Sequence, residues 1–219
     1  MKALKLDIYQ ESACYKKPFA FKVAETYPLP PYSTVKGFLH RLMGAEEFVP
    51  MSISVQGSFE NIFFNLQSMY SYKTKKENTS VPSYIHTLYN VNLKIHVLAQ
   101  PDILNAITEG IKSSSEYFSL GRREDLAVIN DVKEVDINEV YIGRGRGEPY
   151  ILKCPVYIPK PKLPYGINGI NYRLNWKYET QNGVRVWERI DAVYVEGGNI
   201  IDYGSILLDH ENDVVFFNE

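Results

Sequence analysis

Cysteine is scarce in this chain of 219 residues, which contains only Cys14 and Cys154. Two cysteines so far apart in sequence form neither a disulfide framework nor the closely spaced ligand set of a structural metal site. Free thiols are typical of proteins that work in a reducing compartment. We therefore expect a cytoplasmic protein with no disulfide, no metal and no cofactor.

Long apolar runs are also lacking. No segment approaches the roughly 18 consecutive apolar residues that a membrane-spanning helix requires. Residues 1–7 alternate apolar and charged side chains, and they contain no apolar run of signal-peptide length. The sequence therefore predicts a globular protein that has no membrane partner.

A catalytic constellation is missing as well. The four histidines are His40, His86, His96 and His210, and they are scattered along the chain. No spacing resembles a metal site, a serine elbow or a cysteine–histidine pair, and no Gly-x-x-x-x-Gly-Lys loop is present. We predict no catalytic residue and no metal ligand.

Charge is distributed unevenly along the chain, although the net charge is only −2. Residues 1–44 contain seven Lys or Arg against three Asp or Glu, whereas residues 190–219 contain seven acids and no Lys or Arg. Such asymmetry favours a polyanion at the basic end, with the acids turned away from it. The alternative is an ordinary solvated surface.

The clearest helical pattern covers residues 33–43. Its apolar side chains recur at helical spacing and belong to Val35, Phe38, Leu39, Leu42 and Met43. We expect Ser33 to cap the helix and Gly44 to end it. Gly37 costs about 1 kcal/mol inside a helix, so we expect another backbone to approach it closely.

Strand patterns flank this helix. They cover residues 4–8, 53–59, 64–72, 91–97 and 126–137, and a second helix begins at Pro101. If residues 64–72 belong to a long hairpin that follows the second strand, the order is βαββαβ, which is typical of the ferredoxin-like motif that RNA-recognition domains share. We predict an α+β protein with a ferredoxin-like domain at 1–136 and a smaller antiparallel β domain at 137–219.

Basic and aromatic side chains alternate in residues 15–22. Tyr15, Lys16, Lys17 and Lys22 supply the rings and ammonium groups that single-stranded nucleic acid requires, because rings stack on unpaired bases and ammonium groups meet phosphates. The two phenylalanines of this segment are expected in the core. The segment is therefore a candidate RNA-binding site.

Two further basic motifs point the same way. Ser33, Thr34 and Lys36 at a helix N-terminus form a candidate phosphate seat, unless Ser33 is only a cap and Lys36 only a solvated lysine. Arg122 and Arg123 follow the second helix, where one arginine could instead pair with the adjacent Glu124 or Asp125. A glycine-rich loop adds Arg144 and Arg146.

Three segments resemble the Cas-five subunits of type I CRISPR surveillance complexes, within the RAMP superfamily. They are the strand near residues 4–15, the run Pro31–Phe38 and the run Tyr117–Leu126. The similarity is greatest to the type I-B branch. It covers residues 1–45 and 115–130 and is weak in the last third of the chain.

This resemblance implies a non-catalytic subunit of an antiviral Cascade complex. The subunit would bind the five-prime handle of the CRISPR RNA and cap the backbone filament, next to a backbone RAMP subunit and the large subunit, and it would meet target DNA only indirectly. Residues 59–92 would form a β-hairpin thumb. The tip of the thumb would carry Lys73, Lys75 and Lys76.

Two alternatives remain. In the type I-C branch of this family, relatives cut precursor RNA without metal, through a Tyr/Lys/His-type site. His40 with Lys36 and a nearby tyrosine is the candidate for such an endoribonuclease here. The other alternative is an unrelated β-rich protein-interaction domain whose basic residues are ordinary surface.

Overall fold

The computed structural model describes residues 1–20, 23–72, 78–143 and 148–219. Six of the predicted RNA-binding residues lie outside the described residues: Lys22, Lys73, Lys75, Lys76, Arg144 and Arg146. The remaining candidates can be located in the structure.

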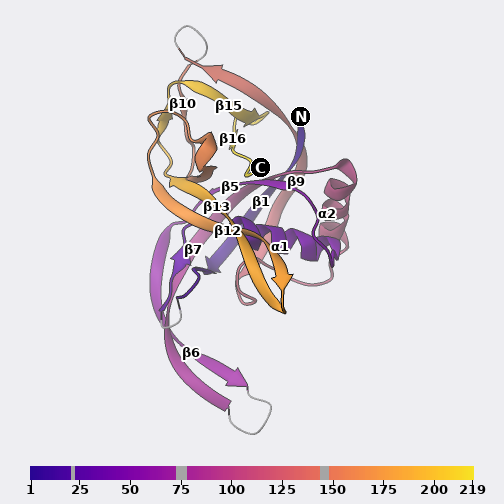
Figure 1. Cartoon of the computed structure of the whole chain (residues 1–219), viewed down its shortest axis with the longest axis vertical. Helices are drawn as coiled ribbons and strands as arrows, with labels where there is room; N and C mark the ends of the chain where they lie inside the picture. Colours follow the sequence, from indigo (N-terminus) through magenta and orange to yellow (C-terminus); the bar gives the residue numbers. More distant parts are fainter. Residues whose placement is uncertain (21–22, 73–77, 144–147) are drawn as a thin grey trace.

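The N-terminal elements follow in the predicted order (Figure 1). They are β1 (Lys2–Ala13), α1 (Tyr32–Met43), β5 (Ser52–Ser58), β6 (Asn61–Tyr72), β7 (Asn78–Leu98), α2 (Pro101–Ser113) and β9 (Leu126–Ile142). Four short strands lie between them: β2 (Tyr15–Lys16), β3 (Val23–Ala24), β4 (Thr26–Tyr27) and β8 (Phe118–Ser119). The order is therefore strand, helix, three strands, helix, strand, and most strands are longer than their apolar patterns.

Helix α1 begins at Tyr32, two residues before the start that a cap at Ser33 implies. Pro31 occupies the cap position without a side-chain hydrogen bond, so the prediction that Ser33 caps the helix is wrong. Gly44 ends the helix in a left-handed conformation with φ of 63°, as predicted. Val35 and Leu39 are completely buried against the sheet. The apolar face therefore positions the polar residues of the same helix.

The central strands run in the order β5-β7-β1-β9, and each neighbouring pair is antiparallel. Leu6 in β1 lies opposite Ile95 of β7 and Val132 of β9. Helices α1 and α2 lie together on one side of these strands (Figure 1). The main core fills the space between the helices and the sheet.

Strands β6 and β7 form a long hairpin that projects from the body of the protein (Figure 1). Their pairing runs from Asn61 opposite Tyr89 to Tyr72 opposite Asn78. This hairpin coincides with the thumb expected at 59–92. Several apolar side chains on it are exposed, including Phe64, Leu66 and Tyr84.

The described residues after β9 form strands and one short helical turn. These are β10 (Tyr150–Ile151), β11 (Val156–Pro159), a 3-10 turn (Lys160–Lys162), β12 (Ile170–Gln181), β13 (Val184–Val195), β14 (Ile200–Ile201), β15 (Gly204–Asp209) and β16 (Val214–Val215). Among the described residues, β11–β13 extend the central sheet beyond β5, and β15 and β16 extend it beyond β9. The predicted domain boundary at 136/137 falls inside β9.

The C-terminal strands take part in two cores because their side chains alternate. Tyr157 and Tyr194 face the main core beneath the helices. Val156 and Val195 face a second apolar cluster, which includes Ile206 and other residues of the C-terminal segment. This period of two buries both faces of β11 and of the C-terminal end of β13.

Replacement by alanine is predicted to have opposite effects on the stability of the protein at two helical glycines. A Cβ at Gly110 would lie 1.9 Å from the carbonyl oxygen of Leu42, so α1 and α2 touch there. A Cβ at Gly37 would meet nothing within 4 Å, so the predicted close approach at Gly37 is wrong. We expect Gly110→Ala to lower the free energy of unfolding by about 1–3 kcal/mol, and Gly37→Ala to raise it by about 1 kcal/mol. Urea denaturation measures both, and equal effects would contradict this packing.

Candidate nucleic-acid interface

The loop after β8 is fastened to β1 and β2 by a buried polar network. The Gln10 side-chain amide donates to the carbonyl oxygens of Leu120, at 2.9 Å, and Asp125, at 3.2 Å. The Tyr15 hydroxyl donates to the side-chain oxygen Oε1 of Gln10 at 2.6 Å. Two of the basic motifs singled out in the sequence therefore meet in space, although more than 100 positions separate them.

Asp125 is the centre of this junction and is completely buried. Its carboxylate accepts hydrogen bonds from the backbone N–H groups of Cys14, at 3.1 Å, and Arg122, at 2.8 Å. It also accepts from the Arg122 guanidinium at 2.7 Å. The sequence allowed for one arginine to pair with Glu124 or Asp125. Arg122 is that arginine: its guanidinium is paired with Asp125, so it orders the loop and is not free to bind a phosphate.

Tyr15 is part of this network and is only 2% exposed. Burial raises the pKa of its hydroxyl well above the usual value. The predicted stacking of Tyr15 on an RNA base is therefore wrong for this structure, because the ring faces the core. Aromatic residues in basic segments are ambiguous in a sequence, since a ring serves a core and a stacked base equally well.

Two of the described basic residues in these segments remain exposed. Lys16 and Arg123 extend into solvent from β2 and from the loop that Asp125 holds. The charge of Lys17 is partly neutralised, because its ammonium lies 3.3 Å from the Glu25 carboxylate. We call Lys16, Lys17, Arg122 and Arg123 the junction cations. Lys16 and Arg123 are the members with the most freedom to meet a phosphate.

Lys36 is not on this surface, and its predicted role as a solvated phosphate ligand is contradicted. The residue is 5% exposed. Its ammonium lies 3.5 Å from the ring centroid of Phe48 and 3.7 Å from that of Trp176. Ser33 and Thr34 are half-buried, and Ser33 lines the same cavity as Lys36. The α1 motif and the junction cations are therefore separate features.

His40 is held by backbone groups on both sides of its ring. Its Nε2 accepts from the Val49 N–H at 3.0 Å, so its Nδ1 carries the proton and donates to the Lys36 carbonyl at 2.8 Å. Burial lowers the pKa of this imidazole. The ring is thus a neutral structural link between α1 and the following loop.

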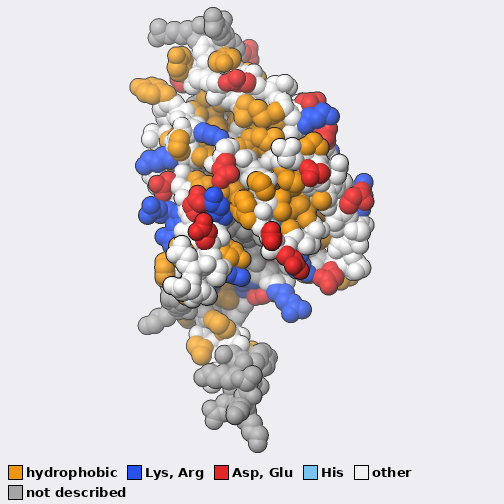
Figure 2. All heavy atoms as spheres, turned by 45° about the vertical axis from the view of Figure 1, so that its right-hand side comes forward, with side chains coloured by type: hydrophobic (Ala, Val, Ile, Leu, Met, Phe, Trp, Pro, Cys, Tyr) orange, Lys and Arg blue, Asp and Glu red, His pale blue; other side chains and the backbone are white. Residues whose placement is uncertain are grey.

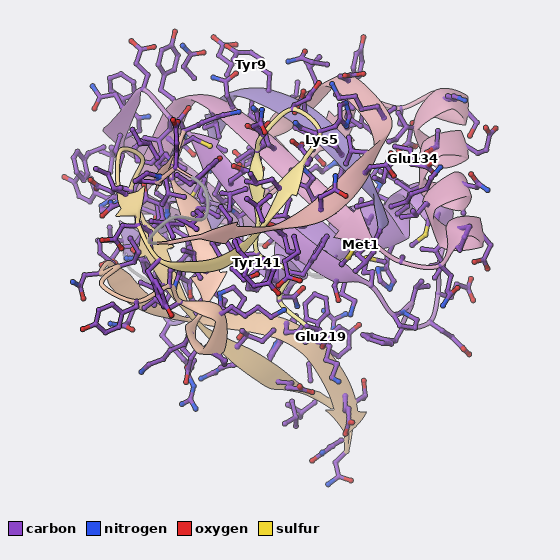
Figure 3. The ribbon with its side chains drawn as sticks, turned by 90° about the horizontal axis from the view of Figure 1, so that it is seen from above. Met1, Lys5, Tyr9, Glu134, Tyr141 and Glu219 are labelled. Atoms are coloured by element: carbon purple, nitrogen blue, oxygen red, sulfur yellow. The ribbon has the colours of Figure 1, made fainter. Side chains whose placement is uncertain are left out.

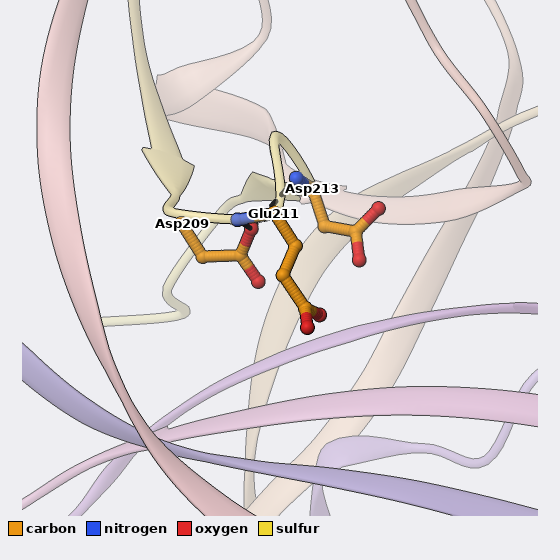
Figure 4. Close-up of side chains that lie close together, drawn as sticks. All are labelled: Asp209, Glu211 and Asp213. Atoms are coloured by element: carbon orange, nitrogen blue, oxygen red, sulfur yellow. Dashed lines mark hydrogen bonds between the residues drawn. The ribbon is translucent and has the colours of Figure 1, made fainter.

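The acidic C-terminal stretch is partly neutralised within the chain. Asp209, Glu211 and Asp213 converge on one point (Figure 4). The Lys5 ammonium occupies that point, at 2.8, 2.5 and 2.6 Å from their carboxylate oxygens. Figure 3 shows Lys5 beside the C-terminal strands. Three of the seven acids therefore serve folding.

One face of the molecule is mixed in charge. Figure 2 shows apolar side chains gathered in the middle of this face, with acidic and basic side chains interspersed around them. No broad region of one sign is visible among the described residues on this side.

Comparison with known families decides the assignment. The model of the family described as CRISPR-associated protein (Cas_Cas5) matches residues 3–181. The chain belongs to this family. Membership overturns the alternative of an unrelated β-rich domain.

The fold of this Cas_Cas5 protein is also found in solved structures. A chain from a structure titled "CRISPR RNA-guided surveillance complex" matches with a TM-score of 0.63 and 13% identity, over 90% of this chain and 91% of that one. A CRISPR protein from Archaeoglobus fulgidus matches with a TM-score of 0.51 and 9% identity, over 100% and 99%. No curated protein sequence matches this chain.

No helix in the described part of the chain has the length and apolar character needed to cross a bilayer.

Proposed function

We propose that this Cas_Cas5 protein is a non-catalytic subunit of a type I CRISPR surveillance complex in the cytoplasm. It binds the five-prime handle of the CRISPR RNA and caps the backbone filament for antiviral defence. The observation that carries the proposal is the junction, in which Asp125 fastens the loop that bears the exposed Arg123 to the segment that bears the exposed Lys16. Ordered cations of this kind bind a phosphate backbone without reading its sequence.

The sheet supports an RNA-binding architecture. We interpret the order β5-β7-β1-β9, with two helices on one side, as a ferredoxin-like layout. Because that layout serves many functions, the argument depends on the family and the junction and not on the fold alone.

The hairpin of β6 and β7 is the proposed thumb. Phe64 is 69% exposed, Leu66 is 62% exposed and Met69 is 50% exposed. Apolar side chains gathered on a projecting hairpin are typical of a protein-binding surface. We assign this surface to the neighbouring backbone RAMP subunit, while the large subunit would lie elsewhere on the chain.

The endoribonuclease alternative is not favoured by the histidines. His40 is bonded to backbone on both sides, and His96 is buried against Asp209 at 3.0 Å. His86 packs on Phe64, with ring centroids 4.5 Å apart. A general base must reach the ribose hydroxyl, and the candidate His40 is held by backbone groups, so a type I-B-like, non-cutting role is the better assignment.

Purification from the native operon tests this proposal. We expect the tagged chain to carry CRISPR RNA with an intact five-prime handle, together with a backbone subunit and a large subunit. Repeat RNA should remain uncut, with or without divalent metal. Recovery of the chain without RNA would contradict RNA binding, and cleavage that is lost in His40→Ala would establish the nuclease alternative.

A further inference from the structure

A cavity of about 420 Å³ lies between α1 and the β12–β13 hairpin, on a part of the chain that the junction does not use. One wall is the face of α1 that contains Ser33, Lys36 and His40. The other wall is formed by β12 and β13, and the loop after α1 closes one side. A cavity of this size is sufficient for one small ring system.

Lys36 is a buried donor that has no acceptor. Among the described residues, no hydrogen-bond partner lies within reach of its Nζ atom. The rings of Phe48 and Trp176 lie against the ammonium, which compensates part of its lost hydration. Burial lowers the pKa of Lys36 to about 8. Because buried donors are nearly always paired in folded proteins, the cavity lacks an acceptor that a ligand would supply.

The opposite wall offers flat apolar surface. Trp187 and Tyr178 lie with ring centroids 5.1 Å apart, and the Arg185 guanidinium lies 4.5 Å from the centre of the Tyr178 ring. Both aromatic side chains line the cavity. Rings in this arrangement suit a planar ligand, since every nucleobase has a face that stacks on an aromatic side chain.

Charge around the opening argues against a lone phosphate. Glu46 and Glu47 line the cavity and are exposed. The Lys177 ammonium forms an ion pair with the Glu188 carboxylate at 3.0 Å. Carboxylates repel a phosphate, but they accept hydrogen bonds from the N–H groups of a base, and an ammonium donates to ring oxygen and nitrogen atoms.

We propose that this cavity receives one unpaired nucleobase of the guide RNA, with an acceptor atom of the base on the Lys36 ammonium and a base face against the Trp187 ring. This proposal depends on the proposed function, because it takes guide RNA as the source of the base. Guanine fits the donors and acceptors best, since it presents O6 and N7 to Lys36 and N–H groups to Glu46 or Glu47.

Intrinsic tryptophan fluorescence tests the cavity directly, because the chain has two tryptophans and both Trp176 and Trp187 line it. The full chain is titrated with guanosine, adenosine, cytidine and uridine, and with inorganic phosphate and ribose 5-phosphate as probes without a base. We expect saturable quenching by nucleosides, strongest for guanosine, and none by the two phosphates. Lys36→Met should weaken guanosine binding at least roughly tenfold, a loss of about 1.4 kcal/mol.

Two variants separate a binding role from a folding role. Lys160→Met removes an exposed lysine outside the cavity and should leave the quenching unchanged. Trp187→Ala leaves Trp176 as the reporter and should also weaken guanosine binding. If Lys36→Met is folded by circular dichroism and binds guanosine normally, or if inorganic phosphate quenches as strongly as guanosine, the proposal is overturned.

The same titration distinguishes this proposal from the proposed function. A complex that retains its guide RNA while nucleosides do not quench the chain would overturn the base-binding cavity alone. A chain that carries no RNA from its native operon would overturn both the proposed function and guide RNA as the source of the base.

Discussion

Replacing Lys5 by methionine is expected to destabilise the protein by about 3–5 kcal/mol at neutral pH, the cost of breaking a buried ion pair. The Lys5 side chain is completely buried and lies within 2.8 Å of three carboxylates. Asp209 and Asp213 are also buried, so without Lys5 they would face each other in a poorly hydrated site. The cost arises mainly from loss of the ammonium that these two carboxylates share, because Lys94 and Lys153 still pair with Asp213, whereas Asp209 keeps only His96 and backbone N–H groups.

The pH dependence of this effect has a definite sign. Burial opposes ionisation of Asp213, but hydrogen bonds from Lys5 and Lys94 lower its pKa to about 2. Hydrogen bonds from Lys133 and Lys5 lower the pKa of Glu211 to about 2. Carboxyl groups of the unfolded chain titrate near pH 4. The cluster therefore stabilises the fold above about pH 4, and this stabilisation is lost as the pH falls towards 2.

Urea denaturation at pH 7 and pH 3 measures the prediction. The stability gap between wild type and Lys5→Met should be large at pH 7 and smaller at pH 3, where protonation removes the repulsion in the variant. Lys2→Met is the control, because Lys2 is exposed and its pairing with Glu134 is solvated. The account is wrong if both variants lower the free energy of unfolding by the same amount at pH 7. It is also wrong if the difference in stability between wild type and Lys5→Met does not change with pH.

The sequence was a good guide to elements that depend on local patterns. The apolar spacing of Val35, Phe38 and Leu39 predicted α1, and Pro101 predicted the start of α2. Alternation in β1 and β7 predicted the central strands, because a buried strand face repeats every second residue. The pairing of Arg122 with Asp125 was also foreseeable, since the two residues are three positions apart.

The fate of single polar residues depended on distant parts of the chain. Lys5 lies on the polar face of β1, but the turn at 209–213 covers that face and buries it. Lys36 lies on the polar side of α1, but Phe48 and Trp176 enclose it. Sequence patterns report which side of an element is polar, whereas contacts made by later segments decide whether that side is exposed.

The cavity was missed for the same reason. Trp176 and Trp187 are the two tryptophans of the chain, and nothing in their spacing indicated that they face α1. One sequence signal could have indicated the cavity: the two rare tryptophans lie close in sequence to Tyr178 and Arg185. Aromatic residues that gather on one hairpin together with a cation warrant examination as a binding surface.

The second large effect concerns the junction cations. Replacing both Lys16 and Arg123 with alanine is expected to weaken binding of guide RNA by the assembled complex roughly tenfold, at about 0.5–1 kcal/mol for each exposed cation. Both side chains are exposed, so the folded structure should persist. Each lost phosphate contact should also flatten the dependence of log affinity on log salt concentration by about 0.7.

The most direct test of RNA binding at the junction is therefore the affinity of the assembled complex for guide RNA at several salt concentrations. Wild type, Lys16→Ala, Arg123→Ala and the double variant are compared, with the exposed Lys160→Ala as the matched control. The account predicts weaker binding and a flatter salt dependence for each junction variant, the largest change for the double variant, and no change for Lys160→Ala. Unchanged affinity and unchanged salt dependence in the double variant would contradict it.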